Sequence, residues 1–180
     1  MARVAYAEEV DHPELARRIR EQRGGKMLNL YRMLMNSPPL AEGWLALLTA
    51  IRQQCDLPAL YRELAILRVA VVNKAPYEFA AHVPFAGKEG MSAAQIEGLK
   101  TLAVGGVAGA SGLYDEKMRA VIAYADSMTR EIHVPDALFD QAAKFFDARQ
   151  MVELTATVGA YNMVSRFLEA LHMDPEAADR

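Results

Sequence analysis

The stretch RELAILRVAVVNKAPYEFAAHVPFAGKEGMSAAQI, residues 62–96, decides the fold. It divides into two apolar segments and the start of a third, with breaks before Pro76 and at Gly90. Proline is favoured in the first turn of a helix, and glycine just after the end of one. Ser92 and Gln95 have the spacing of a capping box, in which each side chain accepts a hydrogen bond from the other residue's backbone N–H. The stretch therefore predicts consecutive helices joined by short breaks.

Residues 64–72, LAILRVAVV, are also compatible with a buried strand, because their apolar residues have no clean period. The length of the segment and its leucine, alanine and arginine content favour a helix, for which Asp56 is a candidate cap. Elsewhere no pair of segments shows strand alternation around a hairpin turn. We therefore predict an all-α fold, with a glycine-rich loop at 104–113 and further helices at 26–36, 40–54, 115–130, 136–146 and 148–171.

The composition is that of one globular domain. The chain has 180 residues, of which 52% are hydrophobic, and a net charge of −3. We predict a single domain over 1–180, with an arm or first helix at 1–25 and a core over about 26–172. No long basic run appears, which argues against a nucleic-acid or anionic membrane surface. Because no apolar stretch reaches the length of a membrane span and the first residues lack a signal-peptide core, a cytoplasmic location is expected.

Two polar side chains in apolar helical surroundings are the leading candidates for a site. Glu63 and His82 lie in successive predicted helices, where a carboxylate and an imidazole are unfavourable unless they are paired or used. Glu78 lies one helical turn before His82 and shares its face. A short break makes the two helices antiparallel neighbours, so Glu63 can approach the pair. Together they can form a general acid/base centre in which a carboxylate orients the imidazole, and Tyr77 can add a hydrogen bond.

The same three residues have two alternative interpretations. They can form a buried pair that only fixes helix packing, since structural pairs also perturb pKa values. They can also hold a metal ion, because two carboxylates and one histidine suit a hard or borderline cation. A metal site usually needs a further ligand, and the sequence offers no evident one. No metal and no other cofactor is therefore expected.

Three further features are weaker candidates. Asn162 and Arg166 lie one turn apart on an otherwise apolar helix, and Arg166 can bind a substrate carboxylate or pair with a carboxylate such as Glu63. Cys55 is the only cysteine, which excludes an internal disulfide and a CxxC site. The loop 104–113 lacks the order of a phosphate-binding motif, so it is expected to be a connector or the rim of a pocket.

Over residues 62–96 the chain resembles the carboxymuconolactone decarboxylase-like family, which includes the alkylhydroperoxidase-D-like proteins. The family pattern is a Glu on one helix, a short break, a segment written CxxC or YEW, a His, and a Gly before the next helix. Glu63, residues 77–79, His82 and residues 90–92 occupy those places. The resemblance covers about residues 40–130 well, and the whole chain is similar to a longer branch that ends in YNMVSRF.

The resemblance implies an all-helical fold, assembly into dimers, trimers or hexamers, and a site near the Glu/His pair. In peroxidase members two cysteines carry the redox chemistry, with the Glu and His as a proton relay. Those places hold Ala75 and Glu78 here, so thiol peroxidase chemistry is in doubt. Decarboxylase members have no need of cysteines.

These observations support a cofactor-free acid/base enzyme that acts on a small carboxylated or lactone-like molecule. The alternatives are a peroxidase-type oxidoreductase and a non-catalytic binding or assembly protein. A homo-oligomer is expected, because the apolar helix 26–36, Trp44 and the Phe-rich helix 136–146 offer more apolar faces than one small domain covers.

Overall fold

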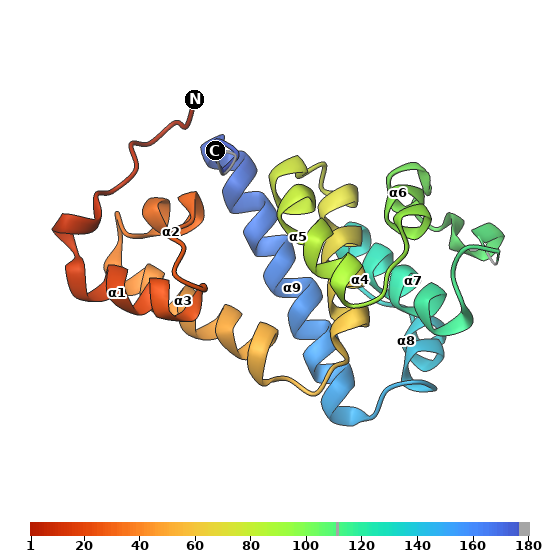
Figure 1. The fold of residues 1–180 in the computed structure, drawn as a ribbon. Coiled ribbons are helices and arrows are strands. Elements are labelled where there is room, and N and C mark those ends of the chain that lie inside the picture. The colour runs from red at the N-terminus through yellow and green to blue at the C-terminus, as the bar shows by residue number, and fades with distance from the viewer. Residues whose placement is uncertain (111, 177–180) are drawn as a thin grey trace. The chain divides into compact units, whose positions relative to one another are not determined.

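The computed structural model describes residues 1–110 and 112–176, and over these residues the chain forms helices and no strand (Figure 1). The helices are α1 (Pro13–Gln22), α2 (Asn29–Leu34), α3 (Pro38–Thr49), α4 (Ala59–Val72), α5 (Pro76–Lys88), α6 (Ala93–Thr101), α7 (Glu116–Glu131), α8 (Asp136–Ala143) and α9 (Ala148–Leu171). Shorter helical turns are η1 (Glu9–Asp11), η2 (Ala50–Gln54) and η3 (Gly106–Ala110). The all-α prediction is confirmed. Among the described residues, no helix is long and apolar enough to cross a membrane.

The chain divides into two compact units. One contains Met1–Gln54 and the described residues from Phe167 onward, and the other contains Cys55–Arg166. The predicted arm or first helix at 1–25 contains α1, which ends before Gly24 and Gly25. Both glycines have positive φ angles, of 62° and 82°, a conformation that glycine adopts without steric penalty.

In the first unit, α1 and α2 pack against α3. The ring of Trp44, on α3, packs against Phe167 with the ring centroids 5.1 Å apart. Apolar side chains of α2 and of the residue that follows it are buried: Leu30, Tyr31, Met33, Leu34 and Met35. The apolar surface of the predicted helix 26–36 is therefore used largely within this unit.

In the second unit, α4 is central and packs against α5, α6 and α7. All its side chains from Glu63 to Ala70 are buried. Neighbours on several sides of α4 explain why residues 64–72 lack an amphipathic period. The segment is helical, so the alternative of a buried strand is wrong.

The ends of these helices largely follow the local signals. Pro76 lies in the first turn of α5, and the Ser92–Gln95 capping box is present at the start of α6. Asp56, however, does not cap α4. The residue at the cap position is Pro58, with no side-chain cap, and the Asp56 carboxylate forms an exposed ion pair with Arg149.

Three predicted segments differ in their bounds. Helix 26–36 is shortened to α2 because the backbone of Leu28 is extended. Helix 40–54 begins earlier, at Pro38, and its last five residues form the π-helical turn η2. Helix 136–146 ends at Ala143, the end of α8. The described part of the loop 104–113 contains η3.

Candidate functional site

Helices α4 and α5 bring Glu63, Glu78 and His82 together, and we call these residues the Glu–His–Glu triad. His82 Nδ1 lies 2.6 Å from Glu63 Oε2, across the two helices. His82 Nε2 lies 3.1 Å from Glu78 Oε1, one turn back on α5. Both ring nitrogens of the imidazole therefore face a carboxylate oxygen.

The triad is buried. Glu63, Glu78 and His82 are 2%, 4% and 4% exposed. Tyr161 of α9 meets the imidazole edge to face, with ring centroids 5.1 Å apart, and Phe85 packs on it at 5.8 Å. Tyr161 begins the YNMVSRF segment, but local spacing does not reveal that its ring contacts His82.

The two carboxylates decide the charge of the imidazole. Burial alone lowers the pKa of His82, because it disfavours the charged form. The hydrogen bonds and negative charges of Glu63 and Glu78 outweigh burial, and the pKa of His82 is raised above its ordinary value. The two carboxylates therefore favour the protonated form of the imidazole.

Arg62 lies beside the triad and was not among the residues singled out from the sequence. Its Nε lies 3.5 Å from Glu63 Oε1, and its side chain is 12% exposed. No other hydrogen bond of Arg62 occurs among the described residues. The remaining guanidinium N–H groups of Arg62 are therefore not taken by acceptors of the described residues.

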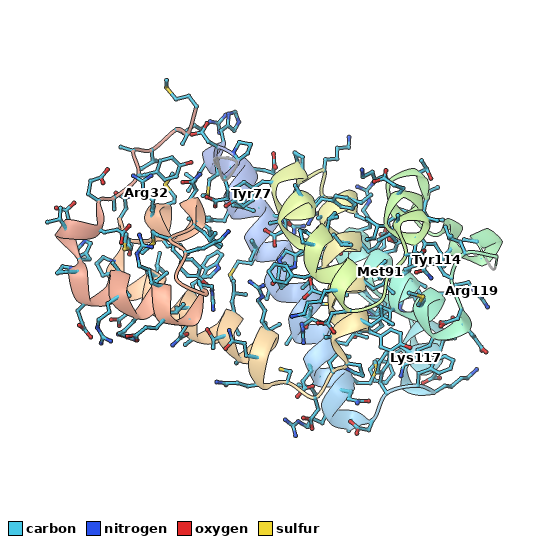
Figure 2. The ribbon with its side chains drawn as sticks, in the orientation of Figure 1. Arg32, Tyr77, Met91, Tyr114, Lys117 and Arg119 are labelled. Atoms are coloured by element: carbon cyan, nitrogen blue, oxygen red, sulfur yellow. The ribbon has the colours of Figure 1, made fainter. Side chains whose placement is uncertain are left out.

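Of the other sequence candidates, Asn162 and Arg166 make their hydrogen bonds outside the triad. Tyr77, labelled in Figure 2, is half-buried on α5 beside Glu78. Asn162 is half-buried and bonds Asn73 and Thr129, each at 3.0 Å. Arg166 is exposed, and its hydrogen bonds go to the carbonyl and side chain of Asn162. Arg166 therefore does not pair with Glu63, as one of its sequence interpretations allowed.

Cys55 is half-buried in the segment that precedes α4. Burial, and then the charge and hydrogen bond of Glu153, raise the pKa of the Cys55 thiol. A raised pKa lowers the thiolate fraction and with it the reactivity of the sulfur.

A second buried polar cluster joins α4 to α7 and was not predicted. Arg68 Nη2 donates to Asp126 Oδ2 at 2.9 Å, and Arg68 Nη1 donates to the carbonyl of Leu102 at 2.9 Å. The backbone N–H of Gly105 also donates to Asp126 Oδ2, at 2.9 Å. Five residues correspond to about 140° around a helix, so Arg68 and Glu63 use different faces of α4.

Among the described residues, the second unit contains two concave sites of small-molecule size. The first has a volume of about 600 Å³ and is formed by α7, α8 and residues 104–108; we call it the α7–α8 cavity. The second, the α8–α9 groove, has a volume of about 910 Å³ and includes Phe139, Phe146, Met151 and Val152 in its lining. The triad lines neither of them. Residues 104–108 of the predicted loop line the α7–α8 cavity, so this part of the loop does form the rim of a pocket. That pocket does not contain the triad.

A metal site is not evident in the described part of the chain. No group of three or more His, Cys, Asp and Glu side chains there has an arrangement that could hold a metal ion. In the triad, each imidazole nitrogen points at a carboxylate oxygen, so the possible ligands face one another rather than a common point.

Comparisons with known proteins agree with this architecture. Residues 38–126 match the carboxymuconolactone decarboxylase family. No curated protein matches the chain. Among solved structures, the apo debrominase Bmp8 is 18% identical with a TM-score of 0.77, over 96% of this chain and 91% of that one. The same debrominase, with a Cys-to-Ala substitution, has been solved with 2,3,4-tribromopyrrole.

Two further structures share the fold. One is an alkylhydroperoxidase AhpD core, an uncharacterized peroxidase-related protein from Ralstonia eutropha JMP134, which is 17% identical with a TM-score of 0.81, over 97% of this chain and 92% of that one. The other is an uncharacterized peroxidase-related protein from Silicibacter sp. TM1040, which is 19% identical with a TM-score of 0.79, over 98% and 92%. Residues 38–126 thus carry a match to the carboxymuconolactone decarboxylase family, and these solved structures show that the chain shares the helical fold of AhpD-like proteins.

Proposed function

We propose that the chain is a cofactor-free acid/base enzyme that acts on a small carboxylated or lactone-like molecule, with His82 as the group that moves the proton. The observation that carries the proposal is an imidazole held between two buried carboxylates, with Nδ1 2.6 Å from Glu63 and Nε2 3.1 Å from Glu78. Buried titratable groups with opposed charges are a usual way to match a pKa to proton transfer near neutral pH.

The geometry suggests a division of roles. The shorter contact, to Glu63, fixes the ring orientation and leaves Nε2 as the nitrogen that exchanges a proton. In the resting state the Nε2 proton is hydrogen-bonded to Glu78, and the substrate replaces Glu78 as its partner. In a decarboxylation, loss of CO₂ leaves an electron pair on a substrate carbon. Nε2 of the imidazolium gives that carbon a proton, and the imidazole becomes neutral.

We assign binding of the substrate anion to Arg62 rather than to Arg166. Protonated His82 and two carboxylates leave the triad with one net negative charge, which repels a carboxylate unless a cation stands nearby. Arg62 supplies that cation with free N–H donors, whereas Arg166 donates to Asn162 on the exposed part of α9. A guanidinium can bind a carboxylate through two parallel hydrogen bonds.

The decisive experiment measures CO₂ release and lactone turnover from a panel of small carboxylated lactones, with carboxymuconolactone among them. His82→Asn should lower kcat by about 10²–10⁴-fold, the usual contribution of a general acid or base. His133→Asn, outside the triad, should leave turnover unchanged. Equal turnover by the wild type and His82→Asn, with a substrate identified, would falsify the assignment of the proton to His82.

A non-catalytic binding or assembly protein is the second candidate. It is favoured by the low exposure of the triad, at 4% or less for each residue, and by the two cavities that lie elsewhere. If the triad only fixes packing, diethyl pyrocarbonate should modify His82 no faster in the native protein than the rate of global unfolding allows. If small molecules enter the site, modification should be fast and should slow when a carboxylated lactone is added.

Peroxidase-type chemistry is the remaining alternative. Its support is the fold shared with peroxidase-related proteins. Three observations argue against it. The chain has a single thiol, and the pKa of that thiol, Cys55, is raised. The places of the family's cysteine pair are occupied by Ala75 and Glu78.

A further inference from the structure

The α7–α8 cavity is a second concave site, with a different lining from the triad. Its floor is made by α7, which turns the small residues Ala120, Ala123 and Ser127 toward it at helical spacing. Val107 and Leu138 complete apolar walls. The volume of about 600 Å³ falls within the range of small-molecule sites, roughly 300–1,000 Å³.

The buried ion pair between Arg68 and Asp126 fixes one wall of the cavity. Gly105 is part of the lining, and its backbone N–H donates to Asp126 Oδ2 at 2.9 Å. Arg68 holds the same carboxylate from the core side, where both side chains are 3% exposed or less. The rim segment is therefore anchored before any ligand arrives, which reduces the ordering that binding would require.

The rim carries a surplus of positive charge. The cations that line the cavity are Arg119, Arg130 and Lys144. The carboxylates that line it outside the buried ion pair are Glu116 and Glu131, so the lining has one more positive than negative charge. Arg119, labelled in Figure 2, donates to the carbonyl of Tyr114 at 2.8 Å. Arg130 and Lys144 have no hydrogen-bond or ion-pair partner among residues 1–110 and 112–176.

We propose that the α7–α8 cavity binds a small amphipathic anion, with its acyl or aryl body on Ala120 and Ala123 and its carboxylate at Arg130 and Lys144. The apolar floor selects the body, and the two uncommitted cations select the charge. The site does not depend on the triad, because it lies on the α7 side of α4. The test of this site is therefore independent of the test of the acid/base proposal.

The test is calorimetric titration of the full chain with octanoate, with octan-1-ol as the neutral analogue and octylamine as the cationic one. Octanoate should bind to a single site, and both analogues should bind much more weakly. The double variant Arg130→Gln/Lys144→Gln should weaken octanoate binding about tenfold or more, because it removes the charge-assisted hydrogen bonds. Ala123→Phe, which fills the floor from a half-buried position, should abolish it.

Two variants serve as controls. Lys88→Gln removes an exposed cation of α5, and Val152→Gln adds a polar group to the α8–α9 groove. Neither should change octanoate binding. Thermal melts establish that each variant is folded, and light scattering establishes its mass.

Four results would overturn the proposal. Equal affinities for octan-1-ol and octanoate would show that the cavity does not select a negative charge. Full binding by Ala123→Phe, or loss of binding in Val152→Gln, would place the ligand elsewhere. A change of oligomer mass in Ala123→Phe would identify a second copy of the chain as the occupant of the cavity.

Discussion

At the scale of single residues, the charge of His82 links the triad to pH. Its pKa is raised in the folded chain, so between the ordinary value of 6.5 and the raised value the folded state binds more protons than the unfolded state. Stability from the imidazolium is fully present below pH 6.5 and is lost as the pH rises through the raised pKa. We expect the free energy of unfolding to fall with pH above neutrality.

Urea unfolding at several pH values from 6 to 9 measures this slope. A His82→Gln variant, which cannot titrate, should lack the part of the slope that His82 contributes. His133→Gln, which removes an imidazole outside the triad, is the matched control. Identical profiles for the wild type and His82→Gln would show that the folded pKa of His82 is not raised.

Cys55 gives a second prediction at this scale. Because its thiol is half-buried and its pKa is raised, Cys55→Ser should change neither the turnover of a carboxylated lactone nor the thermal midpoint appreciably. Hydroperoxide consumption with a dithiol donor should be negligible in both proteins. Robust peroxidase activity that Cys55→Ser abolishes would contradict the acid/base assignment and indicate an external resolving thiol.

The sequence identified some site residues and missed others for a physical reason. Glu63 and His82 stood out because each is a polar side chain among apolar neighbours on its own helix. Arg68 satisfies the same test within LAILRVAVV and was overlooked, although a charge in so apolar a run requires a buried partner. Its partner, Asp126, is 58 residues away, and local spacing cannot reveal such a contact.

At the scale of elements, α6 is fitted closely to the segment before α7. A Cβ atom added at Gly98 would collide with Leu113 Cδ2 and would lie 2.8 Å from Tyr114 Oη. Tyr114 is buried, and its hydroxyl donates to the carbonyl of Gln95 at 2.7 Å, so it cannot move freely. Gly98→Ala should therefore destabilise the chain by about 1–3 kcal/mol in chemical denaturation.

Gly87 provides the matched control for that substitution. It lies in α5, and no atom lies within 4 Å of a Cβ added there. Gly87→Ala should stabilise the chain by about 0.5–1 kcal/mol, through lower backbone entropy in the unfolded state. If the two substitutions had equal effects, the close approach at Gly98 would be disproved.

The ion pair between α4 and α7 leads to a larger expected effect. Asp126→Asn removes the countercharge of Arg68, which is fully buried, and should lower stability by about 3–5 kcal/mol. Glu97→Gln removes one partner of an exposed pair with Lys100 and should change stability little. Urea unfolding of both variants makes the comparison, and a small loss for Asp126→Asn would mean that Arg68 finds other compensation.

Helix ends were predicted correctly where the signal lies within one helical turn. Pro76, Ser92 and Gln95 act through hydrogen bonds within one turn, so their spacing was enough to place the starts of α5 and α6. Asp56 has the composition of a cap as well, but an ion pair with Arg149 of α9 engages its carboxylate instead. Contacts between distant segments thus override local signals where both are available.

At the scale of the whole molecule, several large apolar side chains remain exposed. Leu40 is 59% exposed, Phe139 43% and Val152 69%. Phe139 and Val152 both line the α8–α9 groove. Since the apolar side chains of α2 are buried within their own unit, we expect an oligomer contact at α3 and at this groove rather than at α2.

We therefore predict a homo-oligomer in solution, measured by light scattering at micromolar concentration. Val152→Glu should lower the mass, because it places a charge in an apolar contact. Arg166→Gln, also exposed on α9 but outside the groove, is the control and should keep the wild-type mass. A monomeric wild type would remove the prediction.

The spacing of the triad along the chain has a consequence for how the chain folds. Glu63 and His82 are 19 residues apart, whereas Arg68 and Asp126 are 58 apart. Because the entropy of loop closure grows with loop length, we expect α4 and α5 to meet before α7 joins them. Substitutions in the triad should then slow refolding, while Asp126→Asn should mainly speed unfolding. The contact proposed to move a proton is thus expected to be among the first contacts between helices that the chain makes.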